Sequence, residues 1–305
     1  VFNGKIYIYP SHDEDIDVEN NDNGDQYDMK DYHVYEMPDT ETYPRDCGCV
    51  LKLEDIPWAS KQLWAPDCVE KDGKYYFVFP ARDKEGFFRI GIAIGDKPEG
   101  PFKAEPNYIP GSYSIDPCMF PDTDGKYYLT FGGIWGGQLD QYRNNKWSAD
   151  NKEPKGDEEA CTAKIALMKD NLLEMAEEPK DIMILDENGK PLTGGDEARR
   201  YFEDPWMFKK GDTYYFTYST GTTHLLCYAT SKNVYGPYTY GGVILTPVLG
   251  WTTHHSILEY NGKWYLFYHD CERSGGVNQK RNVKFRELKF NDDGSIQTMD
   301  GSLDK

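Results

Sequence analysis

Residues 203–218 read EDPWMFKKGDTYYFTY: a short apolar segment, a polar turn that contains Gly211, and an aromatic segment. Alternating apolar residues on both sides of a glycine turn are typical of a β-hairpin, because glycine adopts the positive φ that tight hairpin turns need. Glu203 and Asp204 stand where the first strand begins, directly ahead of a proline. The stretch predicts a hairpin with two carboxylates at one end, and one copy alone does not explain their presence.

The same motif, here called the repeated phrase, occurs four more times along the chain with altered residues. The other copies are VFNGKIYIYPSHD (from Val1), APDCVEKDGKYYFVF (from Ala65), IDPCMFPDTDGKYYLTF (from Ile115) and HHSILEYNGKWYLFYHD (from His254). A repeat of roughly 50 residues, widened by insertions, is typical of a propeller blade. Five copies predict an all-β fold, a five-bladed β-propeller with four-stranded antiparallel blades around a central channel, as a single domain over residues 1–305.

The segments between the hairpins complete this prediction. FRIGIAIGDKPEGPF and LLCYATSKNVYGPY both run from a strand through a polar turn to Gly-Pro and an aromatic residue, as repeated outer strands would. The stretch LMKDNLLEMAEE, residues 167–178, predicts a turn or two of helix in a connection. The polar stretch 144–160 predicts a long loop of the third blade that rims the mouth of the channel.

Composition narrows the classes of partner. The formal net charge is −18, which argues against nucleic acid and weighs against a polyanionic substrate. No apolar run reaches membrane-spanning length, so no membrane span is expected, and no signal peptide is visible. The seven cysteines are scattered, and we interpret most of them as small apolar residues.

Polar residues recur at one register of the predicted blades. In a propeller the first strand of each blade lines the central channel, so residues that begin those strands converge at one mouth of it. Counting back from the turn glycines gives Asp67, Asp116, Asp204 with Glu203, and His255. The alternative is that Asp-Pro merely begins a strand or turn, although four blades share the feature.

Four segments, LWAPD, SIDPCMF, YFEDPWMF and THHSILEYNGKWYLFYHD, resemble glycoside hydrolase family 43. The resemblance extends over essentially the whole chain. It implies an inverting hydrolase on a five-bladed propeller that acts on arabinose- and xylose-containing plant glycans, as an α-L-arabinofuranosidase, β-xylosidase or xylan-active enzyme. The partner would be an oligosaccharide or polysaccharide, and such substrates suggest a periplasmic or extracellular location.

The resemblance also implies roles for individual residues. Glu203 matches the general acid, and Asp116 matches the aspartate that orients this acid and raises its pKa. His255 matches a central histidine that binds calcium in some members, directly or through water, and a hydrogen-bonded core histidine is the alternative. Arg281 matches an arginine that reaches the sugar, and a solvated strand charge is its alternative. Asp204 is expected to form local hydrogen bonds on the other side of the strand.

Aromatic residues and Asp67 complete the predicted substrate site. Trp64 is expected to present its ring to a sugar, and Trp135 to lie in a glycine-flanked loop beside the channel. Buried packing is expected for three other tryptophans, namely Trp206, Trp251 and Trp264. No cofactor is expected to be required, and a structural Ca²⁺ in the central channel is the one ion that the resemblance suggests.

The register raises a question about the catalytic base. In the resembled family the base is an aspartate that begins the first strand of the first blade, which corresponds here to a position about three residues ahead of Val1. The first blade is therefore expected to be truncated at its N-terminal strand, and Asp13 and Asp15 follow the second strand instead. The acidic run 12–28 resembles a calcium loop in composition, but its spacing fails the EF-hand pattern, so a solvated insertion is predicted.

Other functions are compatible with part of this pattern. A carbohydrate-binding propeller without catalysis is one alternative, and intact Glu203 and Asp116 count against it. A related fructan hydrolase is disfavoured by Phe-Glu-Asp-Pro in place of Arg-Asp-Pro. A phosphorylase would need a cluster of basic and histidine residues for phosphate, and the sequence has no convincing one.

Overall fold

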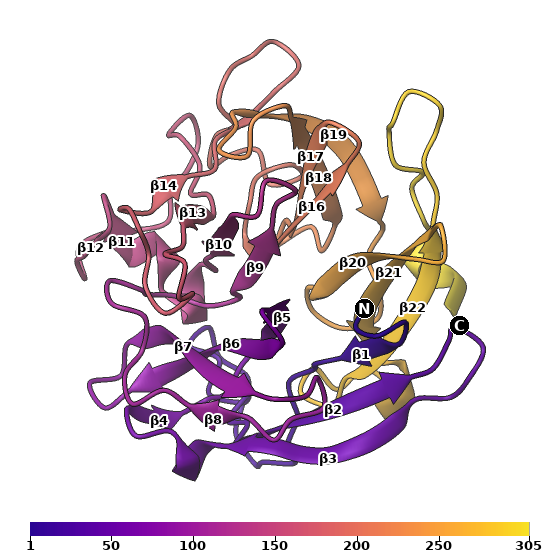
Figure 1. Ribbon diagram of the computed structural model, residues 1–305. Helices are drawn as coiled ribbons and strands as arrows, with labels where there is room; N and C mark the ends of the chain where they lie inside the picture. The colour runs from indigo at the N-terminus through magenta and orange to yellow at the C-terminus, as the bar shows by residue number, and fades with distance from the viewer. Residues whose placement is uncertain (305) are drawn as a thin grey trace. The chain divides into compact units, whose positions relative to one another are not determined.

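The computed structural model describes residues 1–304, and they form strands, turns and short 3-10 helices (Figure 1). Within these residues no helix is long and apolar enough to cross a membrane. The chain divides into two compact units, which are described separately. Unit 1 comprises Val1–Leu129 and Ala166–Glu178, and unit 2 comprises Thr130–Ile165 and Pro179–Lys305.

Unit 1 contains two complete antiparallel sheets. The first has the order β1-β2-β3 and is formed by β1 (Ile6–Ile8), β2 (Asp31–Met37) and β3 (Arg45–Lys52). The second has the order β4-β6-β7-β8, with β5 also paired to β6. Its strands are β4 (Ala59–Lys61), β5 (Asp67–Lys71), β6 (Lys74–Asp83), β7 (Phe88–Gly95) and β8 (Lys103–Ala104), and the 3-10 helix η1 (Leu53–Asp55) precedes them.

A third sheet has the order β14-β13-β10-β9. Its strands are β9 (Cys118–Pro121), β10 (Tyr127–Phe131), β13 (Lys164–Leu167) and β14 (Lys180–Asp181). The long connection between β10 and β13 carries the small hairpin of β11 (Tyr142–Arg143) and β12 (Lys146–Trp147), as well as η2 (Trp135–Gly137) and η3 (Leu139–Gln141). The predicted loop over residues 144–160 is thus present apart from β12.

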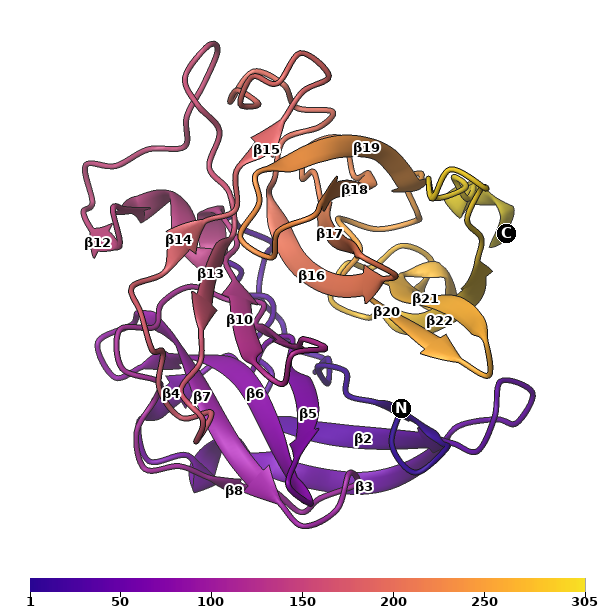
Figure 2. The same ribbon diagram turned by 45° about the horizontal axis from the view of Figure 1, so that its top comes forward.

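Unit 2 contains the last two sheets, which Figure 2 shows as separate layers. One has the order β15-β19-β18-β17-β16 and the other β20-β21-β22. Their strands are β15 (Ile184–Leu185), β16 (Glu203–Lys210), β17 (Thr213–Ser219), β18 (Leu226–Ser231), β19 (Tyr238–Leu245), β20 (His255–Tyr260), β21 (Lys263–Asp270) and β22 (Asn282–Leu288). The 3-10 helices η4 (Glu272–Ser274) and η5 (Gly301–Asp304) complete the described chain.

Five sheets follow one another along the sequence, one for each copy of the repeated phrase, and the predicted all-β five-bladed propeller is confirmed. The sheets hold three to five strands rather than four each. In the fourth blade the extra strand β15 pairs with β19 in parallel.

The five predicted hairpin turns are present, and their backbones explain the sequence signals. At Asp72-Gly73 both turn residues have positive φ, 53° and 76°, which is the requirement of a type I′ turn. The Asn261-Gly262 turn has the same form, with φ of 51° and 76°. Asn-Gly and Asp-Gly are favoured there because these residues tolerate the left-handed region.

Aromatic residues from the second strand of each hairpin fill the cores. Phe77 and Phe79 of β6 are completely buried in unit 1, and Phe216 and Tyr218 of β17 are completely buried in unit 2. Burial of each such ring contributes about 1.5–3 kcal/mol of hydrophobic free energy, so these strands hold the sheets in place.

The predicted helical turns over residues 167–178 are wrong. This segment forms a tight excursion closed by a bridge between Met168 and Met175, and Leu172 at its tip has a φ of 58°. Asn171 accepts a hydrogen bond from the backbone of Leu173, which favours a turn. The apolar residue Leu172 is buried at the tip of this turn and not on the inner face of a helix.

Candidate active site

Glu203 is the first residue of β16, and its Cα pairs with Ser219 of β17. Its carboxylate oxygen Oε1 accepts a hydrogen bond from the hydroxyl of Thr252. Loss of surrounding water raises the pKa of Glu203 above its usual value, and the Thr252 hydroxyl and the Arg281 guanidinium oppose this shift. A carboxyl with a raised pKa that still has one oxygen unoccupied by Thr252 is suited to donate a proton.

Asp204, the next residue, is fully buried and lies in the left-handed region with a φ of 64°. Its Oδ2 accepts a hydrogen bond of 2.9 Å from the backbone of His255 and pairs with Nδ1 of that ring. The other ring nitrogen, Nε2, lies 2.6 Å from the hydroxyl of Thr217. Asp204 therefore ties β16 to β20 across 51 residues, and the expectation that it bonds only locally is wrong.

Two further histidines adjoin this pair. His254 Nε2 lies 3.0 Å from Asp204 Oδ1, and the backbone of His254 donates a hydrogen bond of 2.9 Å to His269 Nε2. Burial lowers the pKa of His254 to about 3, and the nearby Arg281 charge adds to this effect. Both causes also lower the pKa of His269 well below its usual range. The rings are therefore neutral at physiological pH, and Arg281 is the cation of this group.

An aromatic cluster adjoins Glu203 through its sequence neighbours. Phe202 precedes Glu203 and lies edge-on to Trp135, with ring centroids 4.9 Å apart. Trp135 also lies 6.1 Å from the ring of Trp251, which directly precedes Thr252. The ring of His224 meets Trp251 at 4.5 Å. Flat aromatic faces of this kind pack against the apolar faces of sugars.

Buried packing was expected for Trp251, but this side chain is 36% exposed. Trp206 and Trp264 are half-buried, and the indole N–H of Trp206 donates to the backbone oxygen of Ile257 at 3.0 Å. Trp135 lies in η2 rather than in an irregular loop. Glu153, from the polar stretch 144–160, accepts a hydrogen bond of 2.9 Å from the Trp135 indole. The polar stretch therefore helps to hold the Trp135 ring, which the sequence analysis assigned to the substrate site.

The predicted site residues of unit 1 have a different environment. Asp67 begins β5 and accepts hydrogen bonds from the backbones of Met119 at 2.8 Å and Cys68 at 2.7 Å. Burial raises its pKa to about 6. Asp116 is buried just ahead of β9, with a φ of 57°. Asp116 and Asp204 each precede a proline and share this left-handed backbone, so the repeated Asp-Pro is a repeated local geometry.

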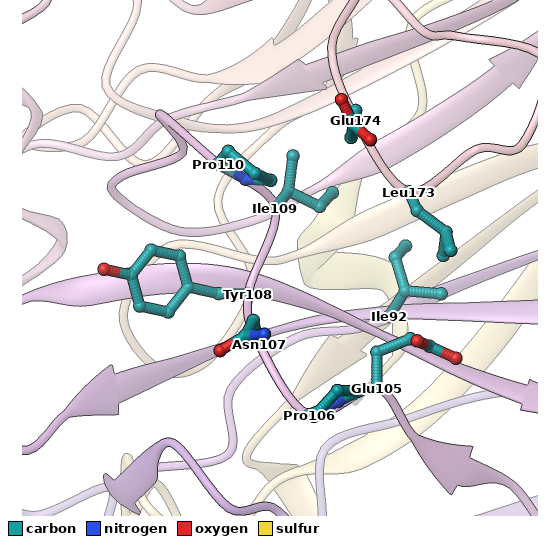
Figure 3. Close-up of a pocket in the computed structure, with 9 residues that line it drawn as sticks. All are labelled: Ile92, Glu105, Pro106, Asn107, Tyr108, Ile109, Pro110, Leu173 and Glu174. Carbon is teal, nitrogen blue, oxygen red and sulfur yellow. The ribbon is translucent and has the colours of Figure 1, made fainter.

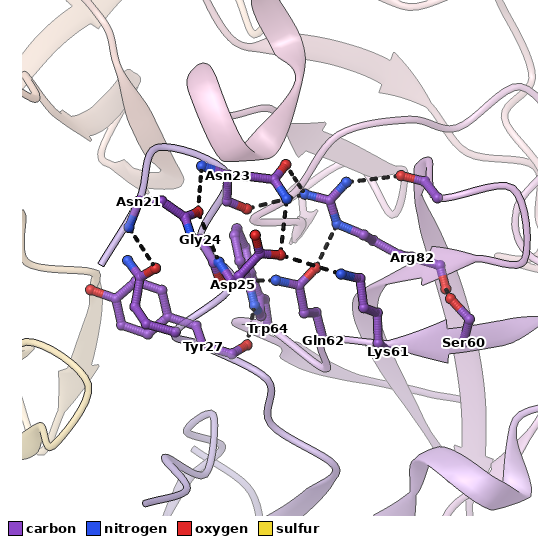
Figure 4. Close-up of polar contacts among 12 residues, drawn as sticks. Asn21, Asn23, Gly24, Asp25, Tyr27, Ser60, Lys61, Gln62, Trp64 and Arg82 are labelled. Carbon is purple, nitrogen blue, oxygen red and sulfur yellow. Dashed lines mark hydrogen bonds and ion pairs between the residues drawn. The ribbon is translucent and has the colours of Figure 1, made fainter. Parts of the chain in front are cut away.

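Trp64 is held by the end of the acidic run (Figure 4). Its indole N–H donates to the backbone oxygen of Tyr27 at 2.8 Å, and its ring lies 4.6 Å from that of Phe88. Gly24 lies so close that a Cβ there would be 2.5 Å from the Trp64 ring. Its role as a sugar contact stays a prediction.

The same segment is anchored by buried Arg82, which donates 2.9 Å and 2.5 Å hydrogen bonds to Asn23 and Gln62. The prediction of a solvated insertion fails for the end of the run, because residues 24–27 are buried or half-buried against β4, β6 and the segment between them. Residues 17–23 are all exposed, as predicted for the middle of the run.

A small surface pocket of about 170 Å³ is present in unit 1 (Figure 3). The segment 105–110, Ile92 of β7, Leu173 and Glu174 line it. It includes none of the residues that the sequence assigned to the site, and Glu174 is engaged by Lys169 at 2.5 Å. The pocket is therefore not part of the candidate active site.

Comparison with known proteins identifies the family. The profile described as "Glycosyl hydrolases family 43" matches residues 3–296. The chain belongs to glycosyl hydrolase family 43. A xylosidase/arabinosidase of Bacteroides ovatus is 57% identical over 302 residues, which cover 99% of this chain and 93% of the relative. Xylosidase/arabinosidase 43A of Humicola insolens is 57% identical, with coverage of 98% and 94%.

A solved structure shows the same relationship. CoXyl43, a family 43 β-xylosidase/α-arabinofuranosidase from a compost microbial metagenome, was determined with xylotriose in a calcium-free form. It is 54% identical, superposes with a TM-score of 0.96, and the match covers 99% of this chain and 92% of that one. This protein is thus a glycoside hydrolase of family 43.

The family resemblance suggested calcium at His255, and the observed contacts do not fit direct ligation. Asp204 and Thr217 occupy both ring nitrogens of His255. Ca²⁺ also prefers oxygen ligands over imidazole. The contacts of His255 are those of a hydrogen-bonded core histidine, and binding of calcium there through water stays a prediction.

Sequence reasoning did not find Thr252 and Trp251 as site residues, and it gave Asp204 only a local role. Each lies beside a predicted one: Thr252 contacts Glu203, Asp204 follows it, and Trp251 precedes Thr252. The stretch WTTHH, residues 251–255, was the signal available in this family 43 chain, since it sets an aromatic, two hydroxyls and two histidines ahead of a strand.

Proposed function

We propose that this enzyme removes single β-D-xylosyl and α-L-arabinofuranosyl residues from neutral xylan-derived oligosaccharides, with inversion at the anomeric carbon. The names of its relatives from Bacteroides ovatus and Humicola insolens combine the two activities. Both sugars are neutral, which suits a chain with a formal net charge of −18.

The position of Glu203 at the start of β16, with its carboxylate held by Thr252 beside the Trp135–Phe202–Trp251 cluster, is the observation that carries the proposal, and a raised pKa agrees with it. In the proposed step Glu203 gives its proton to the glycosidic oxygen as the bond to the anomeric carbon breaks. Water attacks that carbon from the opposite face, and its proton passes to a second carboxylate. Asp116, which the family resemblance assigns to this role, is proposed to keep the acid protonated.

The surroundings of Glu203 support this assignment. The rings of Trp135 and Trp251, supported by buried Phe202, supply an apolar wall for a sugar ring. Arg281 supplies a cation close enough to affect the pKa of Glu203, and it can donate hydrogen bonds to sugar hydroxyls.

The test compares two substrates in the full natural protein, including any residues that precede Val1. In xylobiose the leaving group is a sugar alkoxide, so the glycosidic oxygen must be protonated as the bond breaks. The compound 4-nitrophenyl β-D-xyloside instead releases a stable nitrophenolate with little help from an acid. We expect Glu203→Gln to lower kcat on xylobiose by about 10²- to 10⁴-fold and to affect the nitrophenyl substrate far less.

The matched control is Glu259→Gln, an exposed glutamate on β20. It is expected to retain both activities. Equal losses on both substrates, or unchanged hydrolysis of xylobiose, would show that Glu203 is not the acid. Binding of xylobiose without turnover by the unsubstituted protein would favour a non-catalytic sugar-binding propeller.

A further inference from the structure

A group of metal-ligating side chains lies in unit 1, apart in sequence from every residue assigned to catalysis. His12 lies between β1 and β2, while Asp31 begins β2 and His33 follows two positions later. Residues two apart on a strand point to the same face, so Asp31 and His33 project together. One ligand atom from each of the three residues lies within 4.8 Å of the others.

The contacts show how closely these groups approach. His12 Nδ1 lies 2.5 Å from Asp31 Oδ1, and the two imidazole rings have centroids 4.8 Å apart. From the neighbouring strand β3, both carboxylate oxygens of Asp46 lie 3.1 Å from His33 Nδ1. His33 is therefore oriented by a carboxylate outside the group of three, which is how ligating histidines are usually held in metal sites.

We propose that His12, Asp31 and His33 bind a divalent transition-metal ion of the zinc type, with Asp46 orienting His33. Imidazole and carboxylate are the ligands that Zn²⁺ takes in proteins, at about 2.0–2.2 Å. Three protein ligands leave a fourth position for water. Ca²⁺ and Mg²⁺ do not suit the site, because they prefer an all-oxygen ligand set.

Binding requires a modest adjustment. Ligand atoms around a tetrahedral ion with bonds of about 2.0–2.1 Å lie about 3.3–3.5 Å apart. Here His12 Nδ1 and Asp31 Oδ1 are 2.5 Å apart, and all three ligand atoms lie within 4.8 Å of one another. The strand residues Asp31 and His33 are fixed by pairing with β3. His12 belongs to no strand or helix, so the backbone near it can make the adjustment.

Charge favours a cation at this place. The acidic run that begins at His12 includes Asp13, Glu14, Asp15 and Asp17 within five residues. Side chains of His12, Asp31 and His33 remain 43%, 28% and 21% exposed, which gives an ion access from solvent. A bound ion would connect the segment ahead of β2 to the first sheet and stabilise the folded state in proportion to its occupancy.

The experiment is a titration of the untagged protein with Zn²⁺, followed by calorimetry and by the shift in Tm. Co²⁺ serves as a second probe, because its visible absorption reports imidazole ligation. We expect His12→Gln and His33→Gln each to weaken Zn²⁺ binding by more than about tenfold, since loss even of a partner that only orients a ligand costs about 10- to 100-fold. Asp46→Asn should weaken it less than either.

His224→Gln is the matched control, because His224 lies in unit 2 and outside this group. It should leave Zn²⁺ binding and the Co²⁺ spectrum unchanged. Glycosidase activity is not the readout, so the result is independent of the proposed function. Absence of Zn²⁺ binding in the unsubstituted protein would overturn the proposal, as would full affinity in His12→Gln and His33→Gln. Each of these two variants decides the question if the other fails to fold.

Discussion

Glu203 is a good candidate for the general acid because of the groups that contact it, and not only because of its position in the sequence. Burial raises its pKa, while the Thr252 hydroxyl hydrogen-bonds the charged form and lowers it. The sequence predicted Glu203 from a motif, but it could not predict the contact with Thr252, which is 49 residues away in the chain.

Replacement of Thr252 by valine should shift the pH profile of hydrolysis. Because a general acid must be protonated, activity on xylobiose falls as pH rises through the pKa of Glu203. Thr252→Val removes a group that favours the carboxylate, so that pKa rises and the basic limb of kcat/KM moves to higher pH. Thr252→Ser keeps the hydroxyl and should keep the limb in place. A basic limb that moves to lower pH in Thr252→Val would contradict this account of the contact.

Burial of Asp67 leads to a separate prediction about the pH dependence of the unfolding free energy. Its pKa is raised from 3.8 to about 6 on folding, so the protonated form is favoured in the folded state. Stability is therefore lost as pH rises through this interval. Asp67→Asn removes this pH dependence, so its effect on the unfolding free energy should be more favourable at pH 8 than at pH 4 by about 1–3 kcal/mol. The lost acceptor for one backbone N–H affects both pH values equally.

Urea denaturation at the two pH values measures this effect. Asp212→Asn, in an exposed turn, serves as the control and should leave the pH dependence unchanged. A gain of equal size at both pH values would mean that the charge of Asp67 is not its cause.

At the scale of elements, hairpins were predictable and packing between elements was not. Asn-Gly and Asp-Gly turns fix local φ values, so the strands on either side of Gly73 and Gly262 could be placed from sequence. The segment 167–178 was misassigned because its Leu, Met and Glu residues favour a helix, while its turn at Asn171 and the Met168–Met175 bridge decided the outcome. The exposure of Trp251 likewise depends on contacts with His224 and Trp135.

Replacement of a turn glycine can destabilise the protein through backbone strain and through a clash of the added Cβ, and a comparison of Gly24 with Gly125 distinguishes these two effects. Both have positive φ, 72° and 83°, so an alanine at either position pays about 1–2 kcal/mol of backbone strain. At Gly125 the added Cβ meets nothing within 4 Å, whereas at Gly24 it meets the ring of Trp64. Gly24→Ala should therefore destabilise the protein more than Gly125→Ala and change the tryptophan fluorescence. Equal destabilisation by both would mean that the packing of Trp64 under this segment contributes little.

At the scale of the whole molecule, the repeated phrase determined most of what could be predicted. Five copies of a hairpin with a polar first strand indicated the all-β fold, and the resemblance of four segments to family 43 indicated the class of enzyme. The family 43 match over residues 3–296 agrees with both. The number of strands in each blade was not predictable. For example, β15 joins its sheet by parallel pairing with β19, and the local sequence contains no signal for this pairing. The His12–Asp31–His33 group was missed for a related reason, since its members gather only when the first sheet forms.

The central claim is that this protein hydrolyses terminal xylosides with inversion, and proton NMR of xylobiose hydrolysis tests it most directly. The full natural protein is mixed with xylobiose, and the anomeric signals of the released sugar are followed before mutarotation is complete. The account predicts that α-xylose from the non-reducing end appears first and then equilibrates with the β form. Initial release of β-xylose, or no release of xylose at all, would contradict it.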